Sequence, residues 1–204
     1  GSTATDLINK ASDNEDGWAV ITLGANSLTI YGISSEDLKP DYFYIIPTIE
    51  NTIIGTNNKN EGEESHIGTT GNDYIQASNN SLFSHYDGPD ILNGKEGDDV
   101  LIGGPNERSN GGFEIDTYIF EANSGNDLII GFLFDGTGSS NEYNDIIQIP
   151  IDVNGSGISS FNDILNATSD NKDGWAVIDL GLGNTITLHG VSKSELLQRN
   201  FIIR

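Results

Sequence analysis

The nine residues GKEGDDVLI, numbered 94 to 102, decide the fold of this chain. Glycine stands at the first and fourth places, Asp99 at the sixth and Leu101 at the eighth. The spacing returns, with some departures at the glycines, in GTTGNDYIQ (68–76), HYDGPDILN (85–93), GGFEIDTYI (111–119) and ANSGNDLII (122–130). All follow the pattern Gly-Gly-x-Gly-x-Asp-x-U-x, in which U is a large apolar residue. A repeat of fixed length predicts a stack of similar structural units.

Each residue type in this pattern has a physical role. Glycine reaches backbone conformations that are closed to other residues, so it permits a tight turn. The aspartate stands where the turn ends and a strand begins. The apolar residue two places later points to the same side of that strand and can fill an interior. Two units make one coil and stacked coils make two sheets, so the sequence predicts an all-β chain built on a parallel β-roll.

Stacked turns of this kind predict calcium sites. Successive turns on one edge would lie roughly 4.8 Å apart, the spacing of neighbouring strands. An ion between two turns would receive carbonyl and carboxylate oxygens from both. Ca²⁺ takes six to eight such oxygens, whereas Mg²⁺ demands a tighter octahedron and retains waters. The expected ligands and the turn glycines that shape the sites are Gly68, Gly71, Asp73, His85, Asp87, Gly88, Asp90, Gly94, Gly97, Asp99, Gly111, Asp116 and Asp127.

The spacing also predicts which turns share an ion. Turns on the same edge should be about 18 residues apart in a nine-residue pattern. Asp73 and Asp90 are 17 residues apart, and so are Asp99 and Asp116. We therefore expect one site between the turns ending at Asp73 and Asp90. We expect a second site, on the opposite edge, between the turns ending at Asp99 and Asp116.

A second, longer repeat lies outside the glycine-rich region. DLINKASDNEDGWAVITL (6–23) matches DILNATSDNKDGWAVIDL (163–180) at 12 of 18 positions. The Asp-Gly pairs are turn signals, and the β-branched runs after the tryptophans read as strands. The repeat therefore predicts two homologous β-hairpin capping segments that flank the roll.

The two repeats together divide the chain. We expect residues 1–47 to be the closing segment of a preceding module and residues 48–66 to be a linker. Residues 67–130 are the expected calcium-binding β-roll, and residues 131–204 its exit and C-terminal capping segment. Neighbouring modules of the same chain are therefore expected partners.

The charge of the chain excludes several functions. There are 31 acidic residues against 9 basic ones, a formal net charge of -22. Such a charge repels nucleic acid and anionic membranes, so neither is an expected partner. No apolar run of about 18 residues exists to span a membrane. Cysteine is absent, so thiolate metal sites and disulfides are excluded. A small extracellular domain without disulfides needs another source of stability, and a structural metal is one.

The repeats from Gly68 to Ile130 resemble the RTX family, the hemolysin-type calcium-binding repeats of proteins exported by type I secretion. The segment DTYIF (116–120), followed by GNDLIIGF (125–132), is similar to the usual exit from such a roll. The resemblance implies a secreted bacterial protein whose parallel β-roll forms when calcium binds outside the cell. It also implies that the chain is exported unfolded.

The leading functional prediction is a non-catalytic calcium-binding module that stabilises or extends a secreted protein. No serine-nucleophile motif fits a strand–turn–helix unit. One alternative is a polysaccharide-binding module, because tandem modules of this length are similar to the accessory modules of alginate epimerases. A second alternative is an adhesin segment. It would need one repeated outward residue, whereas the positions after the aspartates hold Tyr74, Ile91, Val100 and Thr117.

Overall fold

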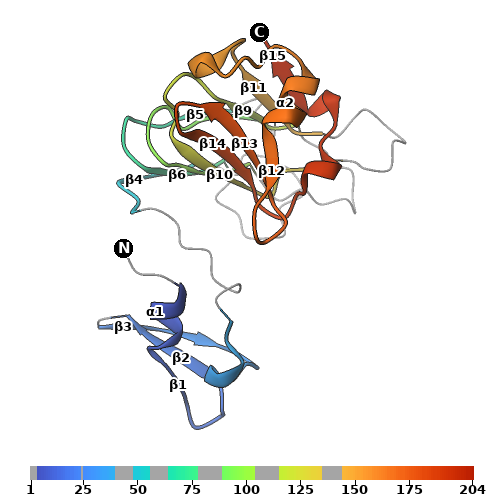
Figure 1. Cartoon of the computed structure of the whole chain (residues 1–204). Helices are drawn as coiled ribbons and strands as arrows, with labels where there is room; N and C mark the ends of the chain where they lie inside the picture. The colour runs from blue at the N-terminus through green and yellow to red at the C-terminus, as the bar shows by residue number, and fades with distance from the viewer. Residues whose placement is uncertain are drawn as a thin grey trace. The chain divides into compact units, whose positions relative to one another are not determined.

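The computed structural model describes residues 4–23, 25–39, 48–55, 64–77, 89–103, 115–134 and 144–204. The chain divides into two compact units, Gly1–Ile46 (unit 1) and Pro47–Arg204 (unit 2). Figure 1 shows both units with most of their helices and strands labelled.

Unit 1 is a three-stranded antiparallel sheet with one short helix. Its elements are α1 (Ala4–Ile8), β1 (Ala11–Asp13), β2 (Ala19–Leu23), β3 (Asn26–Ile30) and the 3-10 turn η1 (Ser35–Asp37). The strand order is β1-β2-β3. Its small core holds the buried side chains of Ala19, Ile21 and Leu38. Gly17 makes the turn between β1 and β2 with a positive φ of 77°, as the Asp-Gly signal predicts.

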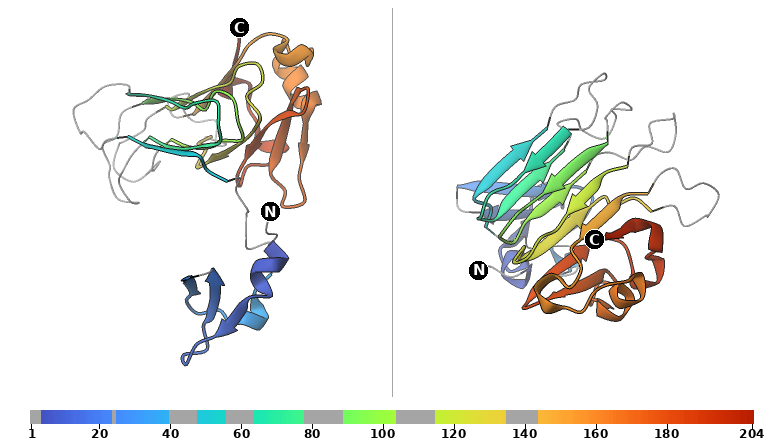
Figure 2. Two further views of the ribbon diagram at one scale, coloured as in Figure 1. Left: turned by 90° about the vertical axis from the view of Figure 1, so that its left-hand side faces the viewer. Right: turned by 90° about the horizontal axis from the view of Figure 1, so that it is seen from above.

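Unit 2 contains two sheets between which the chain alternates (Figure 2). The seven-stranded sheet has the spatial order β12 (Thr168–Asp170), β13 (Ala176–Gly181), β14 (Asn184–Leu188), β10 (Asn126–Ile130), β8 (Val100–Ile102), β6 (Asp73–Gln76) and β4 (Asn51–Ile54). The five-stranded sheet has the order β15 (Phe201–Ile203), β11 (Ile146–Ile149), β9 (Thr117–Ile119), β7 (Asp90–Asn93) and β5 (Glu64–Ile67).

All pairs from β4 to β14, and all pairs in the five-stranded sheet, are parallel. Consecutive strands β4 to β11 fall in alternate sheets, so the chain winds as a coil. The expected all-β parallel β-roll is confirmed. Only β12 and β13, at one end of the seven-stranded sheet, are antiparallel to their neighbours.

One coil of the roll is longer than the expected two nonapeptides. β6 pairs with β8 and β7 pairs with β9, with aspartates 26 residues apart in both cases. Each coil joins one short turn, such as residues 94–99, to one long connection, such as residues 103–116. The nine-residue spacing holds across the short turn from Asp90 to Asp99, whereas Asp116 and Asp127 are 11 residues apart across the next short turn. The long connections add residues that the pattern does not count.

The interior of the roll is filled by the apolar residues of the eighth place. They are fully buried at 0% exposure and comprise Ile75, Leu92, Leu101, Tyr118 and Ile129. Ile147 of β11 continues the row at 0% exposure. Each such side chain contributes roughly 1.5–3 kcal/mol by leaving water. The apolar row therefore supplies the burial that holds the two sheets together.

The C-terminal part closes one end of the seven-stranded sheet. Strand β14 pairs in parallel with β10, and β13 and β12 follow as antiparallel neighbours. The remaining elements are α2 (Phe161–Ala167) and the 3-10 turns η3 (Val153–Gly155), η4 (Lys193–Glu195) and η5 (Gln198–Asn200). Ser192 and Glu195 form a capping box at η4. Within the described residues no helix is long and apolar enough to cross a membrane.

Candidate metal centre

The short turns of the roll lie directly on top of one another. They are residues 68–72, 94–99 and 120–125, and a glycine marks the contact in each turn. Gly97 has a φ of 122°, and a Cβ placed on it would lie 2.6 Å from the carbonyl oxygen of Gly71. A Cβ on Gly125 would overlap the carbonyl oxygen of Gly97 in the same way. Glycine is therefore required, and it brings carbonyl oxygens of one turn against the next turn.

Each of these turns ends in a buried aspartate. Asp73, Asp99 and Asp127 are 0%, 1% and 2% exposed. The Asp73 N–H donates to Oδ1 of Asp99 at 2.8 Å, and the Asp99 N–H donates to Oδ1 of Asp127 at 3.0 Å. Because parallel strands lie roughly 4.8 Å apart, the three carboxylates follow one another at about that spacing. We call these three residues the first aspartate ladder.

In two of the ladder aspartates, the second carboxylate oxygen has no hydrogen-bond partner. Oδ2 of Asp99 and Oδ2 of Asp127 are buried and make no hydrogen bond. Such unsatisfied buried acceptors are rare in folded proteins and need an explanation. Asp73, at the end of the ladder, differs. Its Oδ2 accepts the Thr69 N–H at 2.5 Å, and its Oδ1 accepts the Asn51 side-chain amide at 2.8 Å.

Burial and mutual repulsion disfavour the charged form of these acids. Burial is the larger cause, with the neighbouring carboxylate of Asp73 adding to it, and together they raise the pKa of Asp99 to about 7. Burial, with the charge of Asp99 adding to it, raises the pKa of Asp127 to about 9. A buried carboxylate without a compensating charge costs several kcal/mol. A cation at the two free Oδ2 atoms would remove that cost.

A second polar row fixes the spacing of the same turns. Asn72 accepts the Asp98 N–H at 2.8 Å, and Asp98 accepts the Asn126 N–H at 2.8 Å. These contacts link the residues that precede the ladder aspartates from turn to turn. Asp98 is half-buried and adds one more negative charge beside Asp99.

The opposite sheet carries a second aspartate ladder. It consists of Asp90, Asp116 and Asp145, which are at most 3% exposed. The Asp90 N–H donates to Oδ1 of Asp116 at 3.0 Å, and the Asp116 N–H donates to Oδ1 of Asp145 at 3.1 Å. Burial, with the charge of Asp116 adding to it, raises the pKa of Asp145 well above its ordinary value. Nε2 of His66 lies 3.6 Å from Oδ1 of Asp90.

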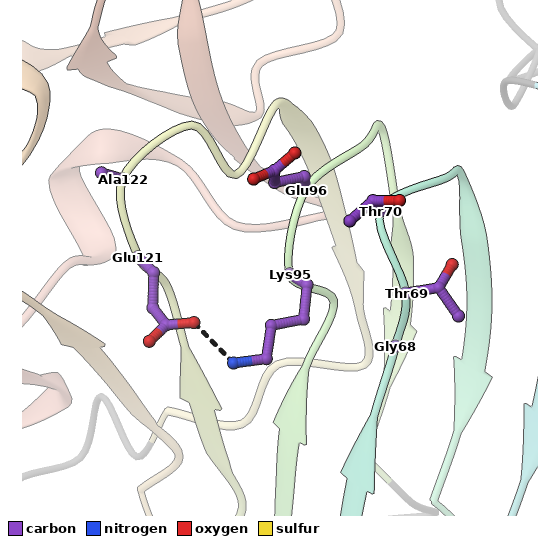
Figure 3. A pocket seen from close by; sticks show the side chains of 7 residues that line it. All are labelled: Gly68, Thr69, Thr70, Lys95, Glu96, Glu121 and Ala122. Carbon is purple, nitrogen blue, oxygen red and sulfur yellow. Dashed lines mark hydrogen bonds and ion pairs between the residues drawn. The ribbon is translucent and has the colours of Figure 1, made fainter.

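A shallow cavity of about 400 Å³ lies over the outer side of the short turns (Figure 3). Nζ of Lys95 donates to Oε2 of Glu121 across it at 2.7 Å. That hydrogen bond is the main reason why the pKa of Glu121 is lowered. The other lining residues are Gly68, Thr69, Thr70, Glu96 and Ala122. The ion pair thus links two successive short turns, and none of the ladder aspartates lines this cavity.

The expected pairing of turns is wrong. Asp73 and Asp90 begin strands of different sheets, and Asp99 and Asp116 precede strands of different sheets. The neighbour of Asp73 is Asp99, and the neighbour of Asp90 is Asp116. The physical reason is the coil length of 26 residues, since the long connections place same-edge aspartates further apart than two nonapeptides. The expectation that Asp90 and Asp99 lie on opposite sides is confirmed.

The other expected site residues divide into two groups. Gly68, Gly71, Gly94 and Gly97 lie in the stacked short turns, and Asp127 completes the first ladder. His85, Asp87, Gly88 and Gly111 lie outside the described residues.

The sequence pattern missed Asp145, although its signal is present. Asn144-Asp145 precedes Ile147 at the same spacing as Asn72-Asp73 and Ile75. The segment lacks only the glycines that the pattern places before the aspartate. The role of Asn72, Asp98 and Asn126 was also missed, because the pattern treats the fifth place as unconstrained.

Side chains alone do not make a preformed metal cage in the described part of the chain. No three histidine, aspartate or glutamate side chains converge there on one point. A cation between two turns would therefore take two ladder carboxylates and main-chain oxygens. The donor set is hard oxygen, which suits calcium and does not suit a soft metal.

No protein-family model matches this chain, and no curated protein matches it in sequence. Several solved structures are similar to it, among them a lipase and two epimerase subunits. The extracellular lipase LipA from Serratia marcescens is 22% identical, with a TM-score of 0.43 over 69% of this chain and 21% of the lipase. This chain thus spans about a fifth of that lipase.

Two further similar structures come from the Azotobacter vinelandii mannuronan C5-epimerase. Its AlgE6R2 subunit is 19% identical, with a TM-score of 0.38 over 74% of this chain and 92% of the subunit. Its AlgE6R3 subunit is 22% identical, with a TM-score of 0.30 over 78% of this chain and 86% of the subunit. The parallel β-roll itself rests on the strand registers described above.

Proposed function

We propose that this chain is a non-catalytic calcium-binding module of the RTX type. The observation that carries the proposal is the first aspartate ladder, in which Oδ2 of Asp99 and Oδ2 of Asp127 are buried without a partner. Stacked, buried carboxylates are unfavourable in a chain of net charge -22 unless cations neutralise them. Bound Ca²⁺ would supply that charge.

Two ion positions follow from the stack of short turns. One lies between the turns that end at Asp73 and Asp99, and the other between the turns that end at Asp99 and Asp127. In each, two carboxylates and the main-chain oxygens of two turns would hold the ion. Asp99 belongs to both positions. The second ladder, Asp90, Asp116 and Asp145, offers the corresponding carboxylates in the other sheet.

In this proposal calcium drives folding. Without the ion the ladder carboxylates repel one another or carry protons, and the stacked turns lose stability. With the ion, the binding free energy adds to the folding free energy. The module would therefore stay unfolded where calcium is scarce and fold in a calcium-rich extracellular medium after type I export.

A calcium titration tests the proposal. The metal-free chain is titrated with Ca²⁺ and, in parallel, with Mg²⁺, while β-structure is followed by circular dichroism and heat by calorimetry. We expect β-structure to rise with Ca²⁺, with a midpoint at or below about 1 mM, the range of extracellular calcium modules. Mg²⁺ at equal concentration should produce little change. An unchanged spectrum and no heat with Ca²⁺ would refute the proposal.

A further inference from the structure

The two hairpin sheets of this chain share most of their internal register, apart from a bulge between Asp179 and Gly181 in unit 2, but have different surroundings. Ala11 pairs with Ile21 in unit 1, as Thr168 pairs with Ile178 in unit 2. In unit 2 the outer edge of β14 is covered by β10 of the roll. In unit 1 the equivalent strand β3 ends its sheet, and no described strand pairs with its outer edge.

The contacts between β14 and β10 show which groups the outer edge of β14 uses to pair with a roll strand. The Thr185 N–H donates to the carbonyl of Gly125 at 2.9 Å, and its hydroxyl donates to Oδ1 of Asn126 at 3.0 Å. Oδ1 of Asn184 accepts the Gly125 N–H at 2.8 Å. A fourth bond runs from the His189 N–H to the carbonyl of Ile129 at 2.9 Å. The edge thus recognises a roll strand that begins Gly-Asn-Asp.

Unit 1 carries the same donors and acceptors on β3. Asn26 and Ser27 stand where unit 2 has Asn184 and Thr185, and each offers the same type of side-chain group. Proteins usually protect a free sheet edge with charged residues, proline or a bulge. The strand NSLTI (26–30) holds no charged residue and no proline. Its edge is therefore chemically suited to pair with another strand.

The apolar residues of unit 1 are exposed where their counterparts are buried. Leu28 is 48% exposed, whereas Ile186 at the equivalent place is 0% exposed. Leu23 is 44% exposed, whereas Leu180 is 0% exposed. In unit 2 these side chains belong to the core that the roll and the hairpin share. Unit 1 thus exposes the apolar side chains that, in unit 2, pack between the hairpin and the roll.

We propose that unit 1 closes a second parallel β-roll, by pairing β3 in parallel with a Gly-Asn-Asp strand of that roll's last coil. The partner is a roll joined to the N-terminal side of unit 1, in the order that unit 2 shows. Ser27 and Tyr31 would donate the two main-chain hydrogen bonds, and Leu23 and Leu28 would enter the partner's core. The inference rests on the proposed function in one respect, because the partner roll needs calcium to form.

The test adds such a roll to the full chain. A copy of residues 47–157 is joined in front of residue 1, so that unit 1 follows it as residues 158–204 follow the natural roll. Hydrogen exchange is then measured in calcium for β3 of the fused protein and of the original chain. We expect exchange at Ser27 and Tyr31 to slow by about tenfold or more on fusion, toward the rate of Thr185 and His189.

Two variants separate this pairing from a general gain in stability. Leu28→Lys puts a charge into the proposed interface. Ser27→Pro removes the Ser27 N–H, which corresponds to the Thr185 N–H that donates to the roll, and is therefore expected to point away from β2. In the original chain both should leave exchange in β2 unchanged, because Leu28 is already half exposed. In the fused protein both should abolish the added protection. Ile186→Lys, the matched control, should disrupt the natural roll and leave the added roll folded.

Each outcome decides one proposal. If the natural roll responds to calcium and β3 gains no protection on fusion, the inference fails and the proposed function stands. If neither roll responds to calcium, the proposed function fails. If β3 in the original chain is protected in a manner that depends on protein concentration, its partner is a second copy of the chain, and the inference is overturned.

Discussion

At the scale of single residues, the buried aspartates set the behaviour of the molecule. Asp99 lies between Asp73 and Asp127, and its Oδ2 has no hydrogen bond. A carboxylate in this place destabilises the metal-free fold and would stabilise the calcium-bound fold. The same atom therefore has opposite effects in the two states, and this distinguishes a metal ligand from a structural acid.

Asp99→Asn should reveal both effects. The amide keeps an oxygen for the Asp73 N–H but carries no charge. At pH 8 without metal, we expect the variant to gain unfolding free energy, on the order of a few kcal/mol. Its calcium midpoint should rise by about tenfold or more, since Asp99 serves both ion positions. Urea denaturation and calcium titration measure the two quantities.

Asp16→Asn is the matched control, because Asp16 is an exposed acid of unit 1. It should change neither quantity. Loss of stability in the metal-free Asp99→Asn protein, with an unchanged calcium midpoint, would show that Asp99 is a structural residue only.

The pH dependence of the metal-free fold follows from the same residues. An unfolded aspartate has a pKa near 3.9, whereas the pKa is raised to about 7 in Asp99 and about 9 in Asp127. The folded state therefore binds more protons between these values, and stability falls as the pH rises from about 4 to 9. Each group contributes up to about 1.4 kcal/mol per pH unit until its folded pKa is passed.

Calcium should reverse this trend, because it competes with protons for the carboxylates. The calcium midpoint should therefore fall as the pH rises. Urea denaturation of the metal-free protein and calcium titration, both at pH 5, 7 and 9, check the prediction. Metal-free stability that increases from pH 5 to 9 would contradict it.

At the scale of elements, the stacked turns depend on glycine for two separate reasons. Gly97 has a positive φ, and it also lies against the carbonyl of Gly71. Gly190 has a positive φ of 75° but nothing within 4 Å of an added Cβ. Comparing substitutions at Gly97 and Gly190 therefore separates the cost of backbone strain from the cost of disturbing the contact between two turns.

Gly97→Ala should cost more than Gly190→Ala. We expect about 1 kcal/mol for strain alone at Gly190 and at least about twice that at Gly97, where a turn must also move. Gly97→Ala should also weaken calcium binding, because the moved turn carries Asp99. Denaturation in saturating calcium and a calcium titration measure both effects. Equal costs at the two positions would show that the stacking contact is unimportant.

The nonapeptide pattern could predict the elements because its glycines, aspartates and apolar residues act locally. It identified the strands that follow Asp73, Asp90, Asp99, Asp116 and Asp127, and the burial of the residue two places after each. It could not predict which turns stack. Stacking depends on the length of a whole coil, and residues 77–84 and 103–110 lengthen each coil without keeping the pattern.

At the scale of the whole molecule, the two units should respond differently to calcium. Unit 2 contains both aspartate ladders within a roll of parallel strands. The described acids of unit 1 are exposed, and its core of Ala19, Ile21 and Leu38 holds no charged group. The folding of unit 2 is thus expected to be linked to calcium, and that of unit 1 is not.

Chelation should therefore act on one unit only. When calcium is removed with EGTA, hydrogen exchange should accelerate in the roll strands from β4 to β11 and stay the same in β2 of unit 1. Exchange followed by peptide mapping measures both units in one sample. Equal acceleration in both units, or none in the roll, would contradict the prediction.

The most direct measurement is a crystal structure of the chain. The crystals are grown with calcium, and diffraction is recorded at a wavelength at which calcium gives an anomalous signal. We predict anomalous peaks between the stacked short turns, with Oδ2 of Asp99 bound to an ion on either side and Oδ2 of Asp127 bound to one of them. Short turns without ions, with the Asp99 carboxylate held only by the Asp73 N–H, would contradict the account.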